Sequence, residues 1–305
     1  MTAPGNDRIA VLGPGGVGGL VAAALARAGR TVTVVAREQT AVVIDRDGLR
    51  VTSSMLGDFT VPVRAVAELT DPVGTLIVAT KATGLDGALE RVAEAAASPL
   101  IVVPLLNGIE HLPSLRERFG PRVAAATIRV EAERIAPGVI EHRSRGAAIG
   151  LATGEPGLRE QLDAAGAALA EAGLEVNHGE TEAATMWSKL TRLCPLALCT
   201  AAHDRPLGAI RADLDLRAEL AAAVDETCAV ARADGAPAES ALVLAELDAT
   251  HHGLTSSLQR DVVAGRAHEL DAIAGAVVRR GATHRIDCPT VEHLIAAVET
   301  RAAAR

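Results

Sequence analysis

A glycine-rich turn near the start of the chain limits its fold more than any other feature. The apolar run Ile9–Leu12 predicts a buried strand, and the Ala- and Leu-rich segment Val17–Arg27 predicts a helix. Between them the sequence GPGGVG, residues 13–18, matches the G-x-G-x-x-G pattern, and a second, β-branched strand is predicted at Thr31–Val35. A strand, this turn, a helix and a second strand make the dinucleotide-binding unit of a Rossmann fold.

The glycines of this turn have separate physical roles. Gly13 permits the tight turn, Gly15 lets backbone N–H groups approach a pyrophosphate, and Gly18 lets the helix pack closely on the strand. The alternative, a flexible turn without a ligand, is less favoured because both flanking elements have the required pattern. The residues of the turn expected to bind the cofactor are Gly13, Gly15, Gly16, Val17 and Gly18.

The residue that follows the second strand predicts which nicotinamide cofactor is bound. A basic side chain at this place accommodates the 2′-phosphate of NADPH, whereas an acidic one binds the ribose hydroxyl of NAD. Arg37 occupies the position, and Glu38 beside it is the residue that would serve NAD instead. We therefore expect NADPH as the cofactor.

Strands and helices alternate along the first part of the chain. Buried strands are predicted at Leu76–Ala79 and Leu100–Val103, with a helix at Leu85–Ala97 between them. This alternation is typical of a parallel sheet covered by helices on both faces. From Val123 to Leu151, short runs separated by Pro-Gly and Arg-Gly pairs indicate antiparallel strands at the far edge of that sheet.

The sequence pattern changes again near residue 180. A helix is predicted at Leu158–Glu171 and a strand at Leu174–Val176, and beyond about Gly179 only helical patterns remain. We therefore predict an α/β fold of two domains, with a Rossmann-type NADP-binding domain at residues 1–180. An all-α domain that carries substrate-binding and catalytic residues is predicted at 181–305.

The composition of the 305 residues argues against some partners and compartments. The formal net charge is −8, and nucleic acids and anionic membranes require a positive surface, so neither is expected as a partner. No window is apolar over the about 18 residues that a membrane span needs, and no signal-peptide pattern is visible, so we expect a cytoplasmic protein. The four cysteines form no CxxC pair, which predicts thiols and no metal site.

Polar residues follow two of the predicted parallel strands, at the edge where such sheets bind ligands. Lys81 follows one strand and Asn107 follows the next, and the helical half contains the segments around Lys189, Ser257 and Glu269. Together with the glycine turn and the basic residue after the second strand, this order resembles the ketopantoate reductase (2-dehydropantoate 2-reductase) family. The likeness extends over nearly the whole chain.

The resemblance implies a fold like that of 6-phosphogluconate dehydrogenase and NADPH-dependent reduction of a 2-oxo acid, as in pantothenate biosynthesis. It places Lys81 and Asn107 beside the nicotinamide and substrate, and it makes Lys189 the group that protonates the carbonyl oxygen as hydride arrives. Ser257 would contact substrate, and Glu269 would anchor substrate and help to place the lysine. A cation that can donate a proton lowers the barrier to hydride addition because the carbonyl oxygen becomes negative. Ala-rich helices make a homodimer plausible.

The chain departs from the family at two positions. The family pattern has asparagines one and two turns after the lysine, where this chain has Leu193 and Ala197. An apolar pair there would leave polar substrate groups unpaired at a cost of about 1–3 kcal/mol each, which favours a bulkier or more apolar 2-oxo acid. The side chains that could supply substitute contacts are Arg192, Thr200, His203 and Asp204.

The sequence also fits two functions other than reduction of a 2-oxo acid. One is an imine reductase or another carbonyl reductase built on the same architecture. The other is a non-catalytic protein that senses NADPH, although a sensor has no need of a proton donor such as Lys189.

Overall fold

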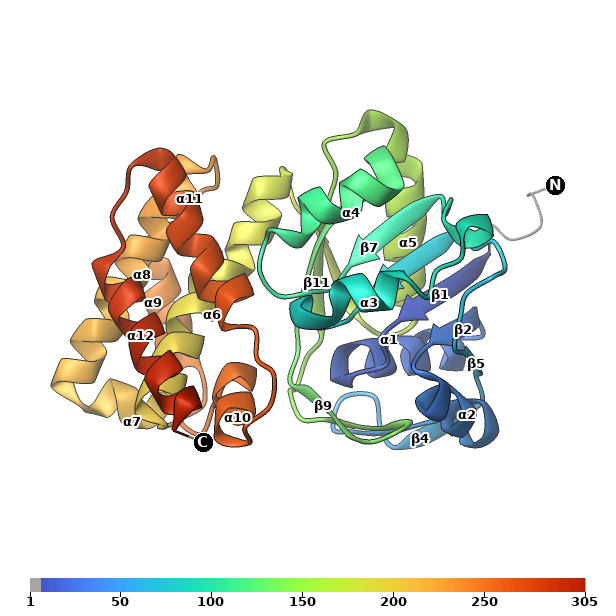
Figure 1. Ribbon diagram of the computed structural model, residues 1–305, viewed down its shortest axis with the longest axis horizontal. Helices are drawn as coiled ribbons and strands as arrows, with labels where there is room; N and C mark the ends of the chain where they lie inside the picture. The colour runs from blue at the N-terminus through green and yellow to red at the C-terminus, as the bar shows by residue number, and fades with distance from the viewer. Residues whose placement is uncertain (1–6, 305) are drawn as a thin grey trace. The chain divides into compact units, whose positions relative to one another are not determined.

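The computed structural model describes residues 7–304, which form two compact units (Figure 1). The first, the sheet unit, comprises the described residues up to Leu106 together with His111–Thr185. The second, the helical unit, comprises Asn107–Glu110 and the described residues from Met186 onward. The short segment Asn107–Glu110 therefore groups with helices that lie far from it in the sequence.

A five-stranded parallel sheet forms the centre of the sheet unit, in the order β5-β2-β1-β6-β7. The predicted strands that begin at residues 9, 31, 76 and 100 are confirmed to within one residue at each end. The three-residue strand β5 has no predicted counterpart, because so short a run carries no periodic pattern. The strands are β1 (Arg8–Leu12), β2 (Thr31–Val35), β5 (Arg64–Val66), β6 (Thr75–Val78) and β7 (Ile101–Pro104).

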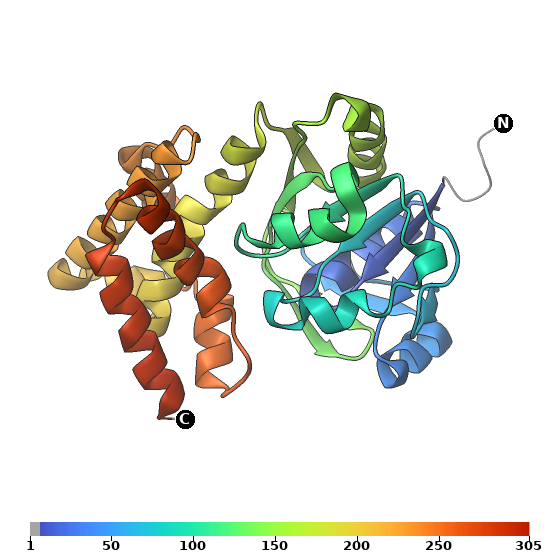
Figure 2. The ribbon, with the colours of Figure 1, turned by 45° about the horizontal axis from the view of Figure 1, so that its top comes forward.

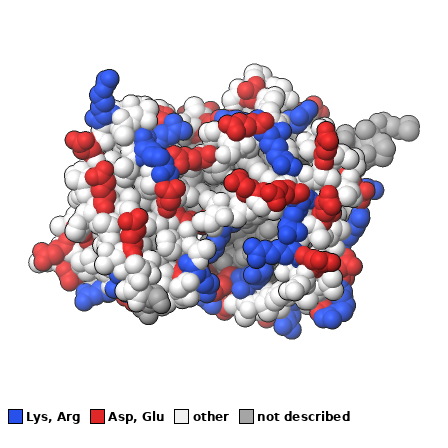
Figure 3. Space-filling view, in the orientation of Figure 1, with Lys and Arg blue, Asp and Glu red and all other residues white. Residues whose placement is uncertain are grey.

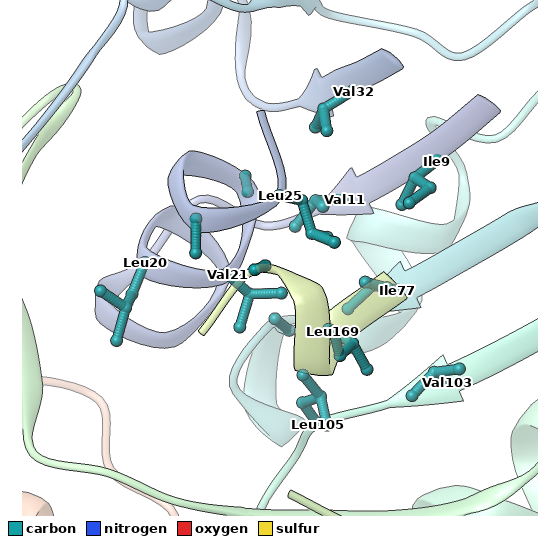
Figure 4. Close-up of a cluster of buried hydrophobic side chains, with 14 of the residues drawn as sticks. Ile9, Val11, Leu20, Val21, Leu25, Val32, Ile77, Val103, Leu105 and Leu169 are labelled. Carbon is teal, nitrogen blue, oxygen red and sulfur yellow. The ribbon is translucent and has the colours of Figure 1, made fainter. Parts of the chain in front are cut away.

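The helices α1 and α5 cover one face of this sheet. Figure 4 shows Val21 and Leu25 of α1 and Leu169 of α5 pointing toward Val11 and Ile77 of the strands. All five side chains are buried, so aliphatic packing holds the layers together. The helices of the sheet unit are α1 (Gly16–Arg27), α2 (Glu38–Asp47), α3 (Leu85–Leu89), α4 (His111–Phe119) and α5 (Arg159–Glu171).

The helix predicted at residues 85–97 is wrong in its extent. It ends at Leu89 and is followed by a separate 3₁₀ turn at Glu94–Ala96. The backbone between them pairs elsewhere, because Leu69 N donates to Arg91 O and Ala93 N donates to Leu69 O. These bonds use groups that a continuous helix would need for its own ladder.

The strands between residues 123 and 151 belong to two further sheets, and a single parallel bridge joins Val123 to Val102 of the edge strand β7, so their predicted place beside that edge holds only at this point. The predicted antiparallel pairing is present, between β9 and β10 and between β8 and β11. However, β10 also pairs in parallel with β3, and β11 with β12, so that the orders are β4-β3-β10-β9 and β12-β11-β8. The strands are β3 (Leu49–Ser53), β4 (Phe59–Val61), β8 (Ala125–Arg129), β9 (Ala132–Ala136), β10 (Val139–His142), β11 (Ala148–Ala152) and β12 (Glu175–His178).

A buried polar pair accompanies the unexpected β3–β10 pairing. Ser53 Oγ lies 2.8 Å from His142 Nδ1, and both residues are buried at the end of the paired strands. Burial lowers the pKa of His142, which keeps its ring neutral near pH 7. Because the contact joins residues 89 positions apart, no local pattern indicates it.

The helical unit contains no strand among its described residues, as the sequence predicts. Its helix α8 packs against α7, α9, α11 and α12. Figure 2 shows the helical unit from a second direction. A π-helical turn, Asp271–Gly275, leads into α11. The helices of this half of the chain are α6 (Glu182–His203), α7 (Leu207–Ala212), α8 (Leu214–Ala233), α9 (Ser240–Ala249), α10 (Ser257–Val263), α11 (Ala276–His284) and α12 (Pro289–Ala303).

The interior of the helical unit holds one buried tryptophan and the thiols. Trp187 on α6 is 1% exposed and donates from Nε1 to Asp234 Oδ2 at 2.8 Å. The cysteines are free thiols, as predicted, and all four are buried; burial raises the pKa of Cys194 to about 12. Such thiols stay protonated and unreactive at neutral pH. The cysteines are Cys194, Cys199, Cys228 and Cys288.

The surface mixes charges of both signs, and Figure 3 shows acidic and basic side chains interspersed over the face in view. Among the helices of the described residues, none is long and apolar enough to cross a membrane.

Close backbone packing at Gly18 gives a test of the fold. A Cβ at this position would lie 2.2 Å from Gly13 O and 3.0 Å from Ala79 Cβ, so α1 touches the end of β1 directly. We expect Gly18→Ala to destabilise the sheet unit by about 1–3 kcal/mol through overpacking. In a unit of this size that lowers Tm by roughly 2–4 °C for each kcal/mol, measured by differential scanning calorimetry.

The matched control is Gly87→Ala. Gly87 is exposed within α3, and a Cβ there meets no atom within 4 Å. Alanine should stabilise this helix by about 0.5–1 kcal/mol. Equal Tm values for the two variants would contradict the close contact at Gly18.

Candidate active site

The glycine turn closes the end of β1 and opens α1. Gly13 has φ +92°, a conformation that favours glycine, and its N–H donates to Val35 O at 3.0 Å. A Cβ on Gly13 would also lie 2.7 Å from Thr80 Cγ2, so both conformation and space require glycine. By contrast, a Cβ on Gly15 would meet no atom within 4 Å.

The open space at Gly15 lies where a pyrophosphate would approach this turn. Gly15 is the N-cap of the twelve-residue helix α1, whose first N–H groups and dipole favour an anion. Thr80 Oγ1, in the residue that packs on Gly13, is buried and has no hydrogen-bond partner among the described residues. The turn and this hydroxyl therefore fit a bound dinucleotide. Thr80 was not among the predicted site residues, although its place two residues after the end of β6, beside Lys81, could have indicated it.

The two basic residues predicted for the cofactor are both exposed in the sheet unit. Arg37 follows β2 as the N-cap of α2, and its guanidinium forms no hydrogen bond or ion pair with any described residue. Lys81 follows Thr80 and precedes the 3₁₀ turn Ala82–Gly84. Glu38 is the first residue of α2.

Three polar side chains from distant parts of the sequence meet in the helical unit. Lys189 Nζ donates to Asn107 Oδ1 at 2.7 Å, and Asn107 Nδ2 donates to Glu269 Oε2 at 2.8 Å. Lys189 lies on α6, whereas Glu269 lies in the segment that precedes the π-helical turn. Glu269 is 8% exposed, and the other two residues are half-buried.

The chemistry of the three groups determines how the Asn107 amide is oriented. An ammonium group only donates hydrogen bonds and a carboxylate only accepts them, so the amide oxygen must face Lys189 and the amide nitrogen must face Glu269. Asn107 thus joins an acid-base group to a buried negative charge. Such an arrangement holds a cationic proton donor in one place.

The predicted Ser257 is not part of this group of hydrogen bonds as described. It is the exposed first residue of α10, whereas the preceding Ser256 is its buried N-cap. Ser256 Oγ accepts hydrogen bonds from Gln259 N at 3.0 Å and from Thr200 Oγ1 at 2.8 Å. Ser256 therefore has a clear structural role, and Ser257 is an exposed residue.

The face of α6 beyond Lys189 is apolar. Leu193, one turn after Lys189, is half-buried, and Ala197, another turn on, is fully buried. The four polar residues nearby are all bonded within the helical unit. Their partners are Thr250 for Arg192, Leu196 O and Ser256 for Thr200, Glu219 for His203, and Gln259 and Arg301 for Asp204.

Among residues 7–304, no three His, Cys, Asp or Glu side chains are placed to hold an ion.

Comparison with known proteins agrees with the fold. The family models described as ketopantoate reductase PanE/ApbA and its C-terminal domain match residues 9–153 and 183–302. The 2-dehydropantoate 2-reductase of Caulobacter vibrioides is 33% identical over 302 residues, covering 96% of this chain and 99% of that protein. This chain belongs to the ketopantoate reductase family.

Two solved structures agree with the architecture. The PanE/ApbA family ketopantoate reductase from Ralstonia eutropha JMP134 has a TM-score of 0.85 at 28% identity, covering 97% of this chain and 99% of that one. D-mandelate dehydrogenase, solved with NADH and anilino(oxo)acetate, has a TM-score of 0.88 at 19% identity, with the same coverage. The second likeness is one of fold. The ketopantoate reductase family is one of oxidoreductases, and this chain shares its two-part α/β and helical architecture.

Proposed function

We propose that this protein reduces a 2-oxo acid with NADPH, with Lys189 as the proton donor. The observation that carries the proposal is the hydrogen-bonded series from Lys189 through Asn107 to the buried Glu269. The names of the ketopantoate reductase relatives support a 2-oxo acid as substrate. The NADH complex of a dehydrogenase with the same fold supports a nicotinamide cofactor.

The sheet unit supplies the residues that would hold the cofactor. The turn from Gly13 to Gly18 would bind the pyrophosphate through backbone N–H groups, with Thr80 and Lys81 beside it. Arg37, which has no partner among the described residues, would pair with the 2′-phosphate. When bound, the cofactor supplies the hydride that reduces the carbonyl carbon.

Lys189 would stabilise the oxygen of that carbonyl as negative charge develops there, and then protonate it. Asn107 Oδ1 accepts one ammonium hydrogen and thereby directs the others. The carboxylate of Glu269 favours the charged lysine and holds the Asn107 amide in place. Lys81 and Lys189 are the chain's only lysines, whereas its arginines are numerous, and an arginine cannot give up a proton at neutral pH.

The substrate we propose is a 2-oxo acid with an apolar side chain. Leu193 and Ala197 offer no hydrogen bond to a substrate hydroxyl, and the polar residues near them already have partners. Ketopantoate carries such a hydroxyl. Its analogue without the terminal hydroxyl should therefore have the higher kcat/KM, and a spectrophotometric assay of NADPH oxidation compares the two directly.

Replacing Lys189 tests the proposed mechanism. We expect Lys189→Met to lower kcat by about 10²–10⁴-fold, the usual contribution of a positioned general acid. Lys189→Arg keeps the positive charge but cannot release a proton, so it should lose turnover as well. The affinity for NADPH, measured by fluorescence titration, should stay near that of the wild type in both variants.

The same assay separates the alternatives. Undiminished turnover by Lys189→Met would contradict the lysine as proton donor. A secondary amine formed from a 2-oxo acid and an added amine would favour an imine reductase, while tight NADPH binding without oxidation across a broad panel would favour a sensor.

Arg37 should determine the preference for NADPH over NADH. A charge-assisted hydrogen bond contributes about 1.5–3 kcal/mol, so Arg37→Ala should raise the KM for NADPH roughly ten- to hundredfold. The KM for NADH should change little, because NADH lacks the 2′-phosphate. Equal effects on both cofactors would contradict this role.

Leu193 gives a test of substrate selection. We expect Leu193→Asn to shift the ratio of kcat/KM values toward ketopantoate by about tenfold, the effect of one hydrogen bond of roughly 1.4 kcal/mol. The matched control is Leu214→Asn on α8, where the leucine is 86% exposed. An unchanged ratio in the Leu193 variant would show that this face does not select the substrate.

A further inference from the structure

The segment Asn107–Glu110 is held to the helical unit by contacts outside the Asn107 amide. Gly108 has φ +83°, and a Cβ on it would lie 2.1 Å from Ala272 O in the π-helical turn. The backbone of the segment therefore rests directly on the backbone of that turn. π-Helical turns are rare and often occur at functional sites.

Arg279 on α11 joins the far end of the segment to the same turn. Its Nε and Nη2 donate to the two carboxylate oxygens of Glu110 at 2.9 and 2.6 Å. Its Nη1 and Nη2 also donate to the two oxygens of Asp271, at 2.7 and 3.1 Å. One guanidinium thus makes two-pronged contacts with carboxylates from both pieces of chain, which a planar donor group favours geometrically.

Space for this arrangement depends on Gly275. A Cβ there would lie 2.5 Å from Asp271 Oδ1 and 3.0 Å from Arg279 Nη1. The glycine at the end of the π-helical turn therefore lets the ion pair lie flat against the backbone.

We propose that Arg279 is a positioning residue that sets the place of Asn107 between Lys189 and Glu269. Glu110 lies three residues after Asn107, and Asp271 lies two residues after Glu269. Arg279 binds both, so it fixes the spacing of the two chain segments whose side chains hold the lysine. The inference rests on the proposed function only for its effect on turnover.

We expect Arg279 to affect the position of Asn107 more than the free energy of unfolding. The side chains of Arg279, Glu110 and Asp271 are 46, 38 and 82% exposed, and exposed ion pairs contribute little to folding. A small displacement of a catalytic group, in contrast, slows a reaction strongly. A variant of Arg279 should therefore lower the rate of turnover while changing the Tm little.

The experiment compares Arg279→Met with Arg217→Met. Arg217 pairs with Asp248 at 2.7 and 2.8 Å, and both side chains are 43% exposed, so it controls for loss of a similar ion pair in the same unit. Hydrogen exchange followed by mass spectrometry measures protection of the backbone in a peptide spanning residues 105–112. The kcat, the KM for NADPH and the Tm are measured alongside.

For Arg279→Met we expect faster exchange in that peptide and a kcat lowered about tenfold, with a KM for NADPH within about twofold of the wild type. Arg217→Met should resemble the wild type in exchange and in kcat, and the Tm values of the two variants should agree.

Glu110→Gln tests the route of the effect. If Arg279 acts through Glu110, the double variant should lose little more turnover than Arg279→Met alone, whereas multiplicative losses would contradict this route.

Unchanged exchange in Arg279→Met would show that Arg279 does not hold the segment Asn107–Glu110. Faster exchange with unchanged kcat would overturn its positioning role. A wild-type protein that reduces no 2-oxo acid would contradict the proposed function separately. The exchange rates would still decide whether Arg279 holds the segment, because that measurement needs no turnover.

Discussion

The side-chain amide of Asn107 is the contact on which the candidate chemistry depends. It accepts from the only lysine of the helical unit and donates to a carboxylate that is almost fully buried. A buried carboxylate is costly unless its oxygens are hydrogen-bonded, and a half-buried ammonium needs an acceptor. One amide meets both requirements and gives the lysine a defined direction.

This contact joins pieces of chain that are 82 and 162 residues apart, which explains what the sequence could and could not predict. The parallel strands and α1 follow from local apolar runs and the glycine turn, because their patterns lie within a few residues. The resemblance to the ketopantoate reductase family also singles out Asn107, Lys189 and Glu269 as candidate site residues. Their hydrogen bonds were not predictable, since they depend on tertiary packing.

The errors in the prediction have the same origin. The helix expected to continue past Leu89 stops because the backbone of Arg91 and Ala93 pairs with Leu69. The strands after residue 123 pair as expected with one another, yet they join sheets whose other members, β3 and β12, come from elsewhere in the sequence. Arg279 carries no local pattern either, because its importance lies in which atoms surround it.

The position of Trp187 gives the molecule an internal optical reporter. It is the chain's only tryptophan, there is no tyrosine, and it lies two residues before Lys189 on the same helix. Its indole is buried and anchored to Asp234, so its emission arises from a single environment within the helical unit. Changes in the packing of α6 can therefore be followed by intrinsic fluorescence without attaching any dye. The sheet unit contributes no tryptophan or tyrosine emission to this measurement.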